Sequence, residues 1–143
     1  MSGFKYLAAL FVAAAMLAAG AAQAMDIIRF DQMAAKDRQA FLDFQSKAAE
    51  TVLQQEGRNA DALKVHHLFN DIAPGSRLPL GEAELEMNLD NARVRDAEKH
   101  AQNHDAPRVQ VEAALIGTLS KHSVQMTPDF AKAFMQMTGT FQP

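Results

Sequence analysis

Apolar residues recur every three or four positions along residues 25–143, and the alternating β-branched runs that mark strands are almost absent. Capping residues, prolines and glycines interrupt this pattern and predict five helices. The helices are expected from Asp31 to Gly57, from Asn59 to just before Pro74, from Glu82 to His104, from Asp105 to Ser120, and from Thr127 to Gly139. No repeat, low-complexity tract or linker divides them. The sequence therefore predicts one all-α domain over residues 25–143, a small bundle of four to five helices.

The first of these helices has two apolar faces. One face carries Met33, Phe41, Phe44, Ala48 and Val52, and the nearly opposite face carries Leu42, Ala49 and Leu53. Two apolar stripes are typical of a helix that packs between neighbours on both sides. A weaker second stripe of Met87, Val94 and Ala101 follows the helix predicted over 82–104. The second stripes face either other helices of the same chain or a second copy of it, so the sequence leaves a homodimer as one of two alternatives.

Residues 1–24 have the three parts of a cleavable signal peptide. Lys5 gives a basic start, a run from Tyr6 to Ala19 has no charged side chain, and the small residues Ala22 and Ala24 precede the expected cut. The alternative is an uncleaved membrane anchor, but a span needs about 20 strongly apolar residues, and this run is shorter and rich in alanine. The chain has no cysteine to carry a lipid. We expect export, with the periplasm favoured and secretion to the medium as the alternative, and no stable membrane anchor after cleavage.

Composition narrows the range of partners. The chain has 14 basic and 17 acidic side chains, and the removal of Lys5 with the signal peptide shifts the net charge from −3 to −4. Because phosphate binding depends on clustered Lys and Arg, this balance argues against a nucleic-acid partner. Residues 25–143 contain Phe but neither Tyr nor Trp. Sites for sugars and bases usually combine a stacking ring with a polar handle, so these ligands are disfavoured.

Asp96, His100 and His104 follow one another at intervals of four residues on the third predicted helix. On a helix this spacing stacks the three side chains along one line, where they can hold a divalent metal such as Zn²⁺. His66, at the edge of the apolar face of the second helix, is the candidate for a fourth ligand. The alternative, which we favour, is structural: histidines stabilise a helix C-terminus, and Asp96 pairs with a neighbouring side chain.

An acidic line of Glu82, Glu86 and Asp90 leads to Arg93 on the same helix. It is either a docking face for a basic partner or, more commonly, a solvated surface with local ion pairs. The loop from Ala73 to Gly81 raises a second question, because Leu78 and Leu80 flank a proline in a turn-like segment. We expect these leucines to cover an edge of the bundle; the alternative is that they present an apolar ridge to a partner.

Three classes of function remain open. The chain has no G-x-S-x-G motif around Ser76, no phosphate-binding loop and no cysteine nucleophile. A non-enzymatic binding module for a protein or a small apolar ligand is therefore our leading hypothesis. A metal-handling protein built on the Asp96 line, and a small enzyme without a recognisable motif, are the alternatives.

Overall fold

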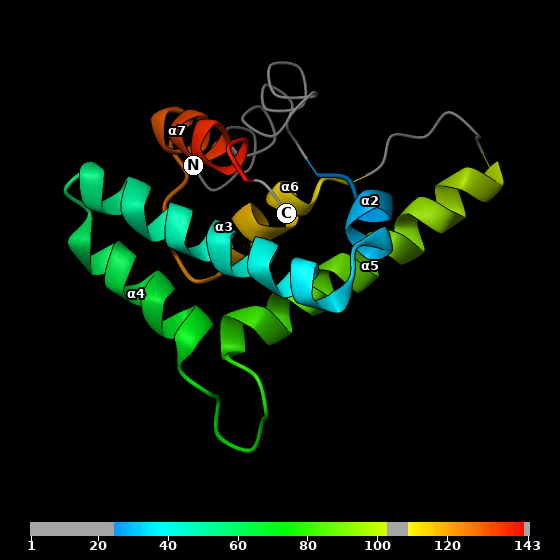
Figure 1. Ribbon diagram of the computed structural model, residues 1–143, viewed down its shortest axis with the longest axis horizontal. Coiled ribbons are helices and arrows are strands. Elements are labelled where there is room, and N and C mark those ends of the chain that lie inside the picture. Colours follow the sequence, from blue (N-terminus) through cyan, green and yellow to red (C-terminus); the bar gives the residue numbers. More distant parts are fainter. Residues whose placement is uncertain (1–24, 103–108, 142–143) are drawn as a thin grey trace.

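The computed structural model describes residues 25–102 and 109–141 of the chain (Figure 1). The predicted signal peptide and the cap predicted at Asp105–Pro107 lie outside these residues. The start predicted for that helix was wrong, because Val109 and Gln110 are not helical and α6 begins at Val111. Six helices and two isolated β-bridges make up the described part, which confirms the all-α class. The helices are α2 (Ile27–Gln32), α3 (Ala35–Gln55), α4 (Asn59–Asn70), α5 (Leu80–Gln102), α6 (Val111–Lys121) and α7 (Pro128–Thr138).

The helix predicted from Asp31 to Gly57 is broken in two, so the expected cap was wrong. Met33 and Ala34 are extended, and they separate α2 from α3. The first cap is Asp26, whose carboxylate accepts a hydrogen bond of 2.7 Å from the Arg29 amide. The break lets α2 fold back, so that the ring of Phe30 lies 6.1 Å from that of Phe41 in α3.

Other helix ends follow the sequence more closely. Gly57 has a φ of +75° directly after α3, the left-handed conformation expected at a helix C-terminus. Thr127 caps α7, since its hydroxyl accepts a 3.1 Å hydrogen bond from the Phe130 amide, and Pro128 occupies the first turn. The cap predicted at Asn59 is one residue off, because Asn59 is already the first residue of α4.

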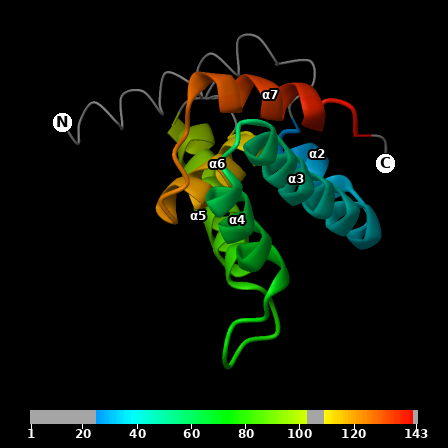
Figure 2. The ribbon, with the colours of Figure 1, turned by 90° about the vertical axis from the view of Figure 1, so that its left-hand side faces the viewer.

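Helices α4 and α7 both pack on α3, and they do so from different sides (Figures 1 and 2). This confirms that α3 is packed on two sides, and residues of both predicted stripes are buried: Phe41, Ala48, Ala49, Val52 and Leu53. One polar residue, Gln45, is fully buried among them, and its amide makes no hydrogen bond with the described residues.

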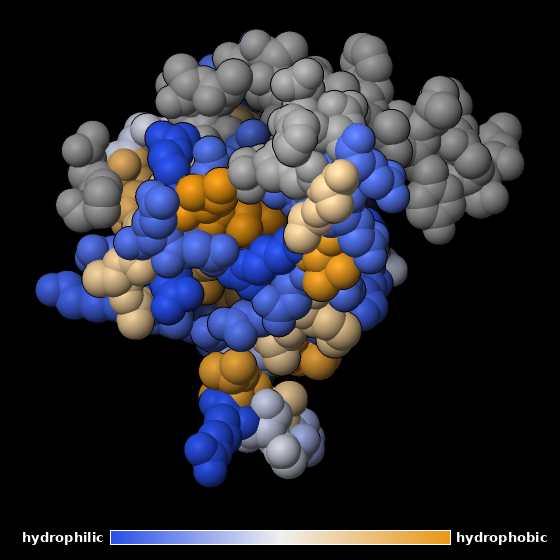
Figure 3. Space-filling view, turned by 90° about the vertical axis from the view of Figure 1, so that its right-hand side faces the viewer, coloured by the Kyte–Doolittle hydropathy of each residue, from blue (hydrophilic) through white to orange (hydrophobic). Residues whose placement is uncertain are grey.

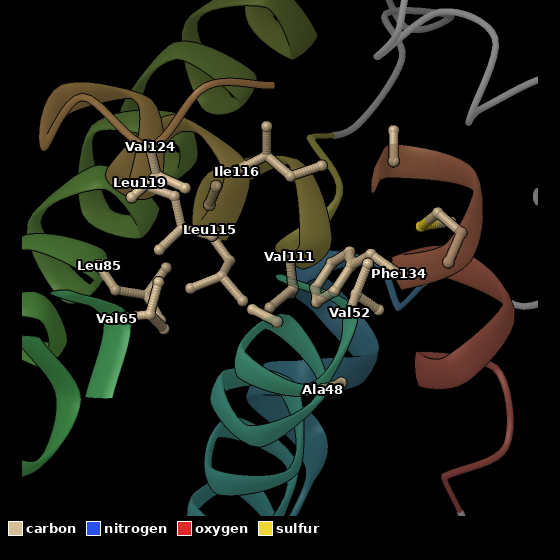
Figure 4. Close-up of a cluster of buried hydrophobic side chains, with 14 of the residues drawn as sticks. Ala48, Val52, Val65, Leu85, Val111, Leu115, Ile116, Leu119, Val124 and Phe134 are labelled. Atoms are coloured by element: carbon tan, nitrogen blue, oxygen red, sulfur yellow. The ribbon is translucent and has the colours of Figure 1, made fainter. Parts of the chain in front are cut away.

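Helix α6 occupies the centre of the core (Figure 4). Leu115 and Leu119 point toward Val65 of α4 and Leu85 of α5, whereas Val111 points toward α3 and α7 (Figure 4). Seven of its eleven residues are buried, including Glu112, which is only 1% exposed. An ionisable side chain in such a position needs a partner.

Residues at both ends of the described chain pack against its core helices. At one limit, the amide of Val111 donates a 2.9 Å hydrogen bond to the Met25 carbonyl, and Asp26 forms an antiparallel bridge with Gln110. At the other, the ring of Phe141 packs edge-on against Phe41, at 5.2 Å between centroids. Within the described residues, no helix combines the length and hydrophobicity that crossing a membrane requires.

Candidate functional site

The connection between α4 and α5 projects from the body of the molecule as a hairpin (Figures 1 and 2). We call residues 72–80 the α4–α5 hairpin. An antiparallel bridge joins Ile72 to Pro79, and the Ala73 amide donates a 3.3 Å hydrogen bond to the Leu78 carbonyl. At the tip, Gly75 has a φ of +74°, a conformation that glycine adopts without strain. These bonds give the hairpin an internal structure of its own.

Three large apolar side chains of the hairpin are exposed. Ile72 is 58%, Leu80 44% and Leu78 37% exposed, and apolar surface is visible on the projection in Figure 3. The expectation that Leu78 and Leu80 cover an edge of the bundle is therefore not met. The reason is that the backbone groups of the loop pair with one another, which holds the loop away from the body instead of against it.

The base of the hairpin is anchored firmly. Pro79 and Gly81 are both buried. Gly81 lies so close to α4 that a Cβ atom at this position would be 2.8 Å from the Leu68 carbonyl oxygen. This close approach fixes the start of α5 against the last turn of α4, and with it the direction in which the hairpin projects.

A second feature is a cleft of about 250 Å³ bounded by α2, the start of α3, and α5. Its apolar wall consists of Phe30, Leu42 and Leu89, and its polar rim of Arg38, Gln39, Glu86 and Arg93, with Ala35 beside them. The cleft is smaller than the 300–1,000 Å³ typical of drug-sized ligands. It brings apolar and charged side chains together.

The two arginines of the cleft differ in how they are bound. Arg93 pairs with Asp31, at 3.1 Å from Nε to Oδ2, and with Asp90, and these hydrogen bonds raise its pKa above the usual value, the Asp31 bond most. The acidic line therefore ends in local ion pairs. Arg38 makes no hydrogen bond or ion pair with the described residues, and its Nε is buried. Glu86 lies on the same rim, but no ion pair joins it to Arg38, so among the described residues Arg38 has no direct partner.

The predicted metal ligands are only partly described. His104 lies outside the described residues, and for His100 only the helical backbone position is described. Asp96 is buried on α5, at 8% exposed. His66 lies instead against α3, with its Nδ1 3.0 Å from Glu50 Oε1. The described residues contain no group of three His, Asp or Glu side chains that could hold a metal.

Sequence analysis missed a histidine–glutamate pair between α5 and α6. His122, at the end of α6, pairs with Glu84, and Lys121 lies 3.8 Å from the same carboxylate. No spacing signal could have found this pair, because its members are 38 residues apart. Neither residue lines the cleft described above, and we regard the pair as a bond between two helices.

The sequence matches no protein-family model, and comparison with curated proteins and with solved structures likewise gives no match. The geometry of the chain itself is therefore the basis for any functional proposal.

Proposed function

We propose that this chain is an exported, non-enzymatic binding module that docks onto a partner protein through the α4–α5 hairpin. The observation that supports this is the projection of an internally bonded hairpin with Ile72, Leu78 and Leu80 exposed. Export is inferred from residues 1–24, whose pattern is that of a cleavable signal peptide.

The hairpin has two properties that favour binding. Its backbone bonds order it before any partner arrives, so docking costs less conformational entropy than it does for a flexible loop. Its exposed apolar area also gives a driving force of about 25 cal/mol for each Å² that a partner removes from water. Arg77 near the tip makes no ion pair with the described residues, so an apolar groove with an acidic rim is the surface that fits.

Site-specific photo-crosslinking in the native host tests this proposal. A photoreactive amino acid at Ile72 is compared with the same residue at Val94, an apolar position on α5 with nearly equal exposure, 57% against 58%. We expect one discrete adduct from position 72 and none from position 94. The adduct should disappear when Leu78→Ser and Leu80→Ser are added, while the circular dichroism spectrum stays unchanged. Equal adducts from both positions, or an adduct that survives the leucine substitutions, would refute docking through the hairpin.

The cleft supports a second candidate function, the binding of a small ligand. The observation that favours it is Arg38, which forms no ion pair with the described residues and lies beside the apolar wall formed by Phe30, Leu42 and Leu89. Arginine recognises carboxylates through two parallel hydrogen bonds, so the class of ligand would be a short amphiphile with an anionic head.

Calorimetry with octanoate and with octanol, which share an apolar body and differ in charge, tests this second candidate. We expect octanoate to bind more tightly than octanol, and the difference to vanish in Arg38→Gln. Arg95→Gln, which removes an exposed arginine of α5 that lies outside the cleft, is the matched control. Equal affinity for the two probes would argue against a role for Arg38 in ligand binding.

A further inference from the structure

The buried carboxylate of Glu112 receives a main-chain nitrogen from the far end of the described chain. Both of its oxygens lie 3.0 Å from the backbone nitrogen of Met25, 87 positions away. A peptide nitrogen has a single hydrogen, which the two oxygens must share in one three-centre hydrogen bond. An α-ammonium group has three hydrogens and a full positive charge, so it fits this arrangement better than an amide does.

Burial makes the need for a cation stronger. Glu112 is 1% exposed, and the described residues include no lysine or arginine that forms an ion pair with it. Loss of hydration raises its pKa from 4.5 to about 7, and the amides of Met25 and of Glu112 itself, and the charge of Arg29, only partly oppose this rise. With an amide as its partner, the carboxyl group is therefore only partly ionised near neutral pH.

Contacts between described residues hold the Met25 nitrogen in position. The Met25 carbonyl accepts the Val111 amide at 2.9 Å, and Asp26 is held by its bridge to Gln110 and by capping α2. The nitrogen is thus directed at the first turn of α6, where Glu112 lies. Met25 is also the residue that follows Ala24, the last residue of the predicted signal peptide.

We propose that Glu112 is the binding site for the α-ammonium group that hydrolysis of the Ala24–Met25 peptide bond creates. In that hydrolysis, water adds a hydroxyl to the Ala24 carbonyl carbon and a hydrogen to the Met25 nitrogen. The new amine then takes a proton from solvent, and the ammonium group pairs with the ionised Glu112. This inference rests on the proposed export, and it adds that processing completes the fold.

Processing would thereby change the stability of the domain. Before cleavage, a buried carboxylate faces only an amide; after cleavage, it faces a cation within hydrogen-bond distance. Removing one member of a buried ion pair is strongly destabilising, because the other charge is left without compensation. The uncleaved chain is accordingly expected to be the less stable form and the processed chain the more stable one.

A comparison of two forms of the protein tests this proposal. The full chain with residues 1–24 is kept intact by blocking cleavage, and the processed chain is recovered from the exported fraction. Each is prepared with Glu112 and with Glu112→Gln, which keeps the shape and removes the charge. Glu98→Gln, at an exposed acid near the end of α5, is the matched control in both forms.

We expect Glu112→Gln to lower the melting temperature of the processed chain at pH 7 by at least about 5 °C, and to leave the full chain unchanged or raise its melting temperature. Glu98→Gln should change neither. In the processed chain, we also expect the α-amine of Met25 to react with an acylating reagent about tenfold more slowly than in Glu112→Gln, because the buried pair protects it.

Three results would overturn the proposal: an equal effect of Glu112→Gln on both forms, an α-amine that reacts equally fast in both processed proteins, or an exported chain whose first residue is not Met25. If no processed chain is recovered, both the proposed export and this inference are refuted. Docking through the hairpin is still measurable on the full chain, so the two proposals can fail separately.

Discussion

Replacing Gly81 with alanine should destabilise the fold, although alanine is the better helix former. The added Cβ would lie 2.8 Å from the Leu68 carbonyl oxygen and 3.1 Å from both the carbonyl carbon and the Cβ of Leu68. The shortest of these is roughly 0.6 Å less than an ordinary van der Waals contact. Two of the three blocking atoms belong to the backbone of α4, so no side-chain rotation can relieve the contact. The helices would have to separate instead.

Two opposing effects set the size of the change. Overpacking that forces a backbone shift costs about 1–3 kcal/mol. The gain in helix propensity from Gly to Ala is about 1 kcal/mol in a helix interior, and it is smaller here because Gly81 is in the first turn of α5. We therefore expect Gly81→Ala to reduce the free energy of unfolding by about 1–2 kcal/mol.

Gly117→Ala provides the matched control. Gly117 lies inside α6, and a Cβ there would meet nothing within 4 Å. The same substitution should stabilise the protein by about 0.5–1 kcal/mol at this position. Its effect on the entropy of the unfolded chain is the same in both variants and cancels when they are compared.

Urea denaturation followed by far-ultraviolet circular dichroism measures both variants. The expected result is a change of opposite sign in the two proteins. If Gly81→Ala stabilises the fold as much as Gly117→Ala does, then α4 and α5 are not held together at Gly81, and the fixed direction of the hairpin loses its support. Gly81→Ala should also weaken the crosslink at Ile72, because the base of the hairpin moves.

Three further outcomes are expected. Gln45→Met should raise the free energy of unfolding in urea by about 1–3 kcal/mol, because it removes a buried amide that has no hydrogen-bond partner among the described residues; a decrease would contradict this. Ser123→Gly should raise it by about 0.5–1 kcal/mol, because φ is 63° at this position, and Ser123→Ala should bring no such gain. In the chain that retains residues 1–24, the pKa of Glu112 is raised to about 7. The contribution of this side chain to the free energy of unfolding is therefore largest below pH 4.5. It should fall by about 3 kcal/mol as the pH rises to 7. Denaturation at several pH values should show this fall in the full chain, and the fall should be absent in the full chain with Glu112→Gln.

The sequence predicted the features that depend on neighbouring residues. The helical class follows from apolar spacing, and the ends at Gly57 and Thr127 follow from local capping chemistry, so all three are confirmed. The break at Met33 was missed for a different reason. Asp26 and Asp31 are equally good caps in sequence, and the choice between them depends on the contact between Phe30 and Phe41, which is tertiary.

The candidate sites were predictable only in part. The loop with Leu78 and Leu80 is evident in the sequence, but whether it folds back depends on backbone bonds that composition does not reveal. The cleft joins residues of α2 and α3 to residues of α5 far along the chain, as in the pair of Asp31 with Arg93. Glu112 is buried on α6, but its partner is a main-chain nitrogen, which leaves no mark on side-chain patterns.

The aromatic cluster around Phe41 has a consequence for the order in which the chain folds. The ring of Phe41 lies between Phe30 and Phe141, which come from opposite limits of the described sequence. A polypeptide leaves the ribosome, or a translocation channel, with its N-terminus first. Helix α3 can be made early, but its central ring stays uncovered until Phe141 has emerged. This part of the core is therefore completed only after Phe141 has emerged, late in the synthesis of the described residues.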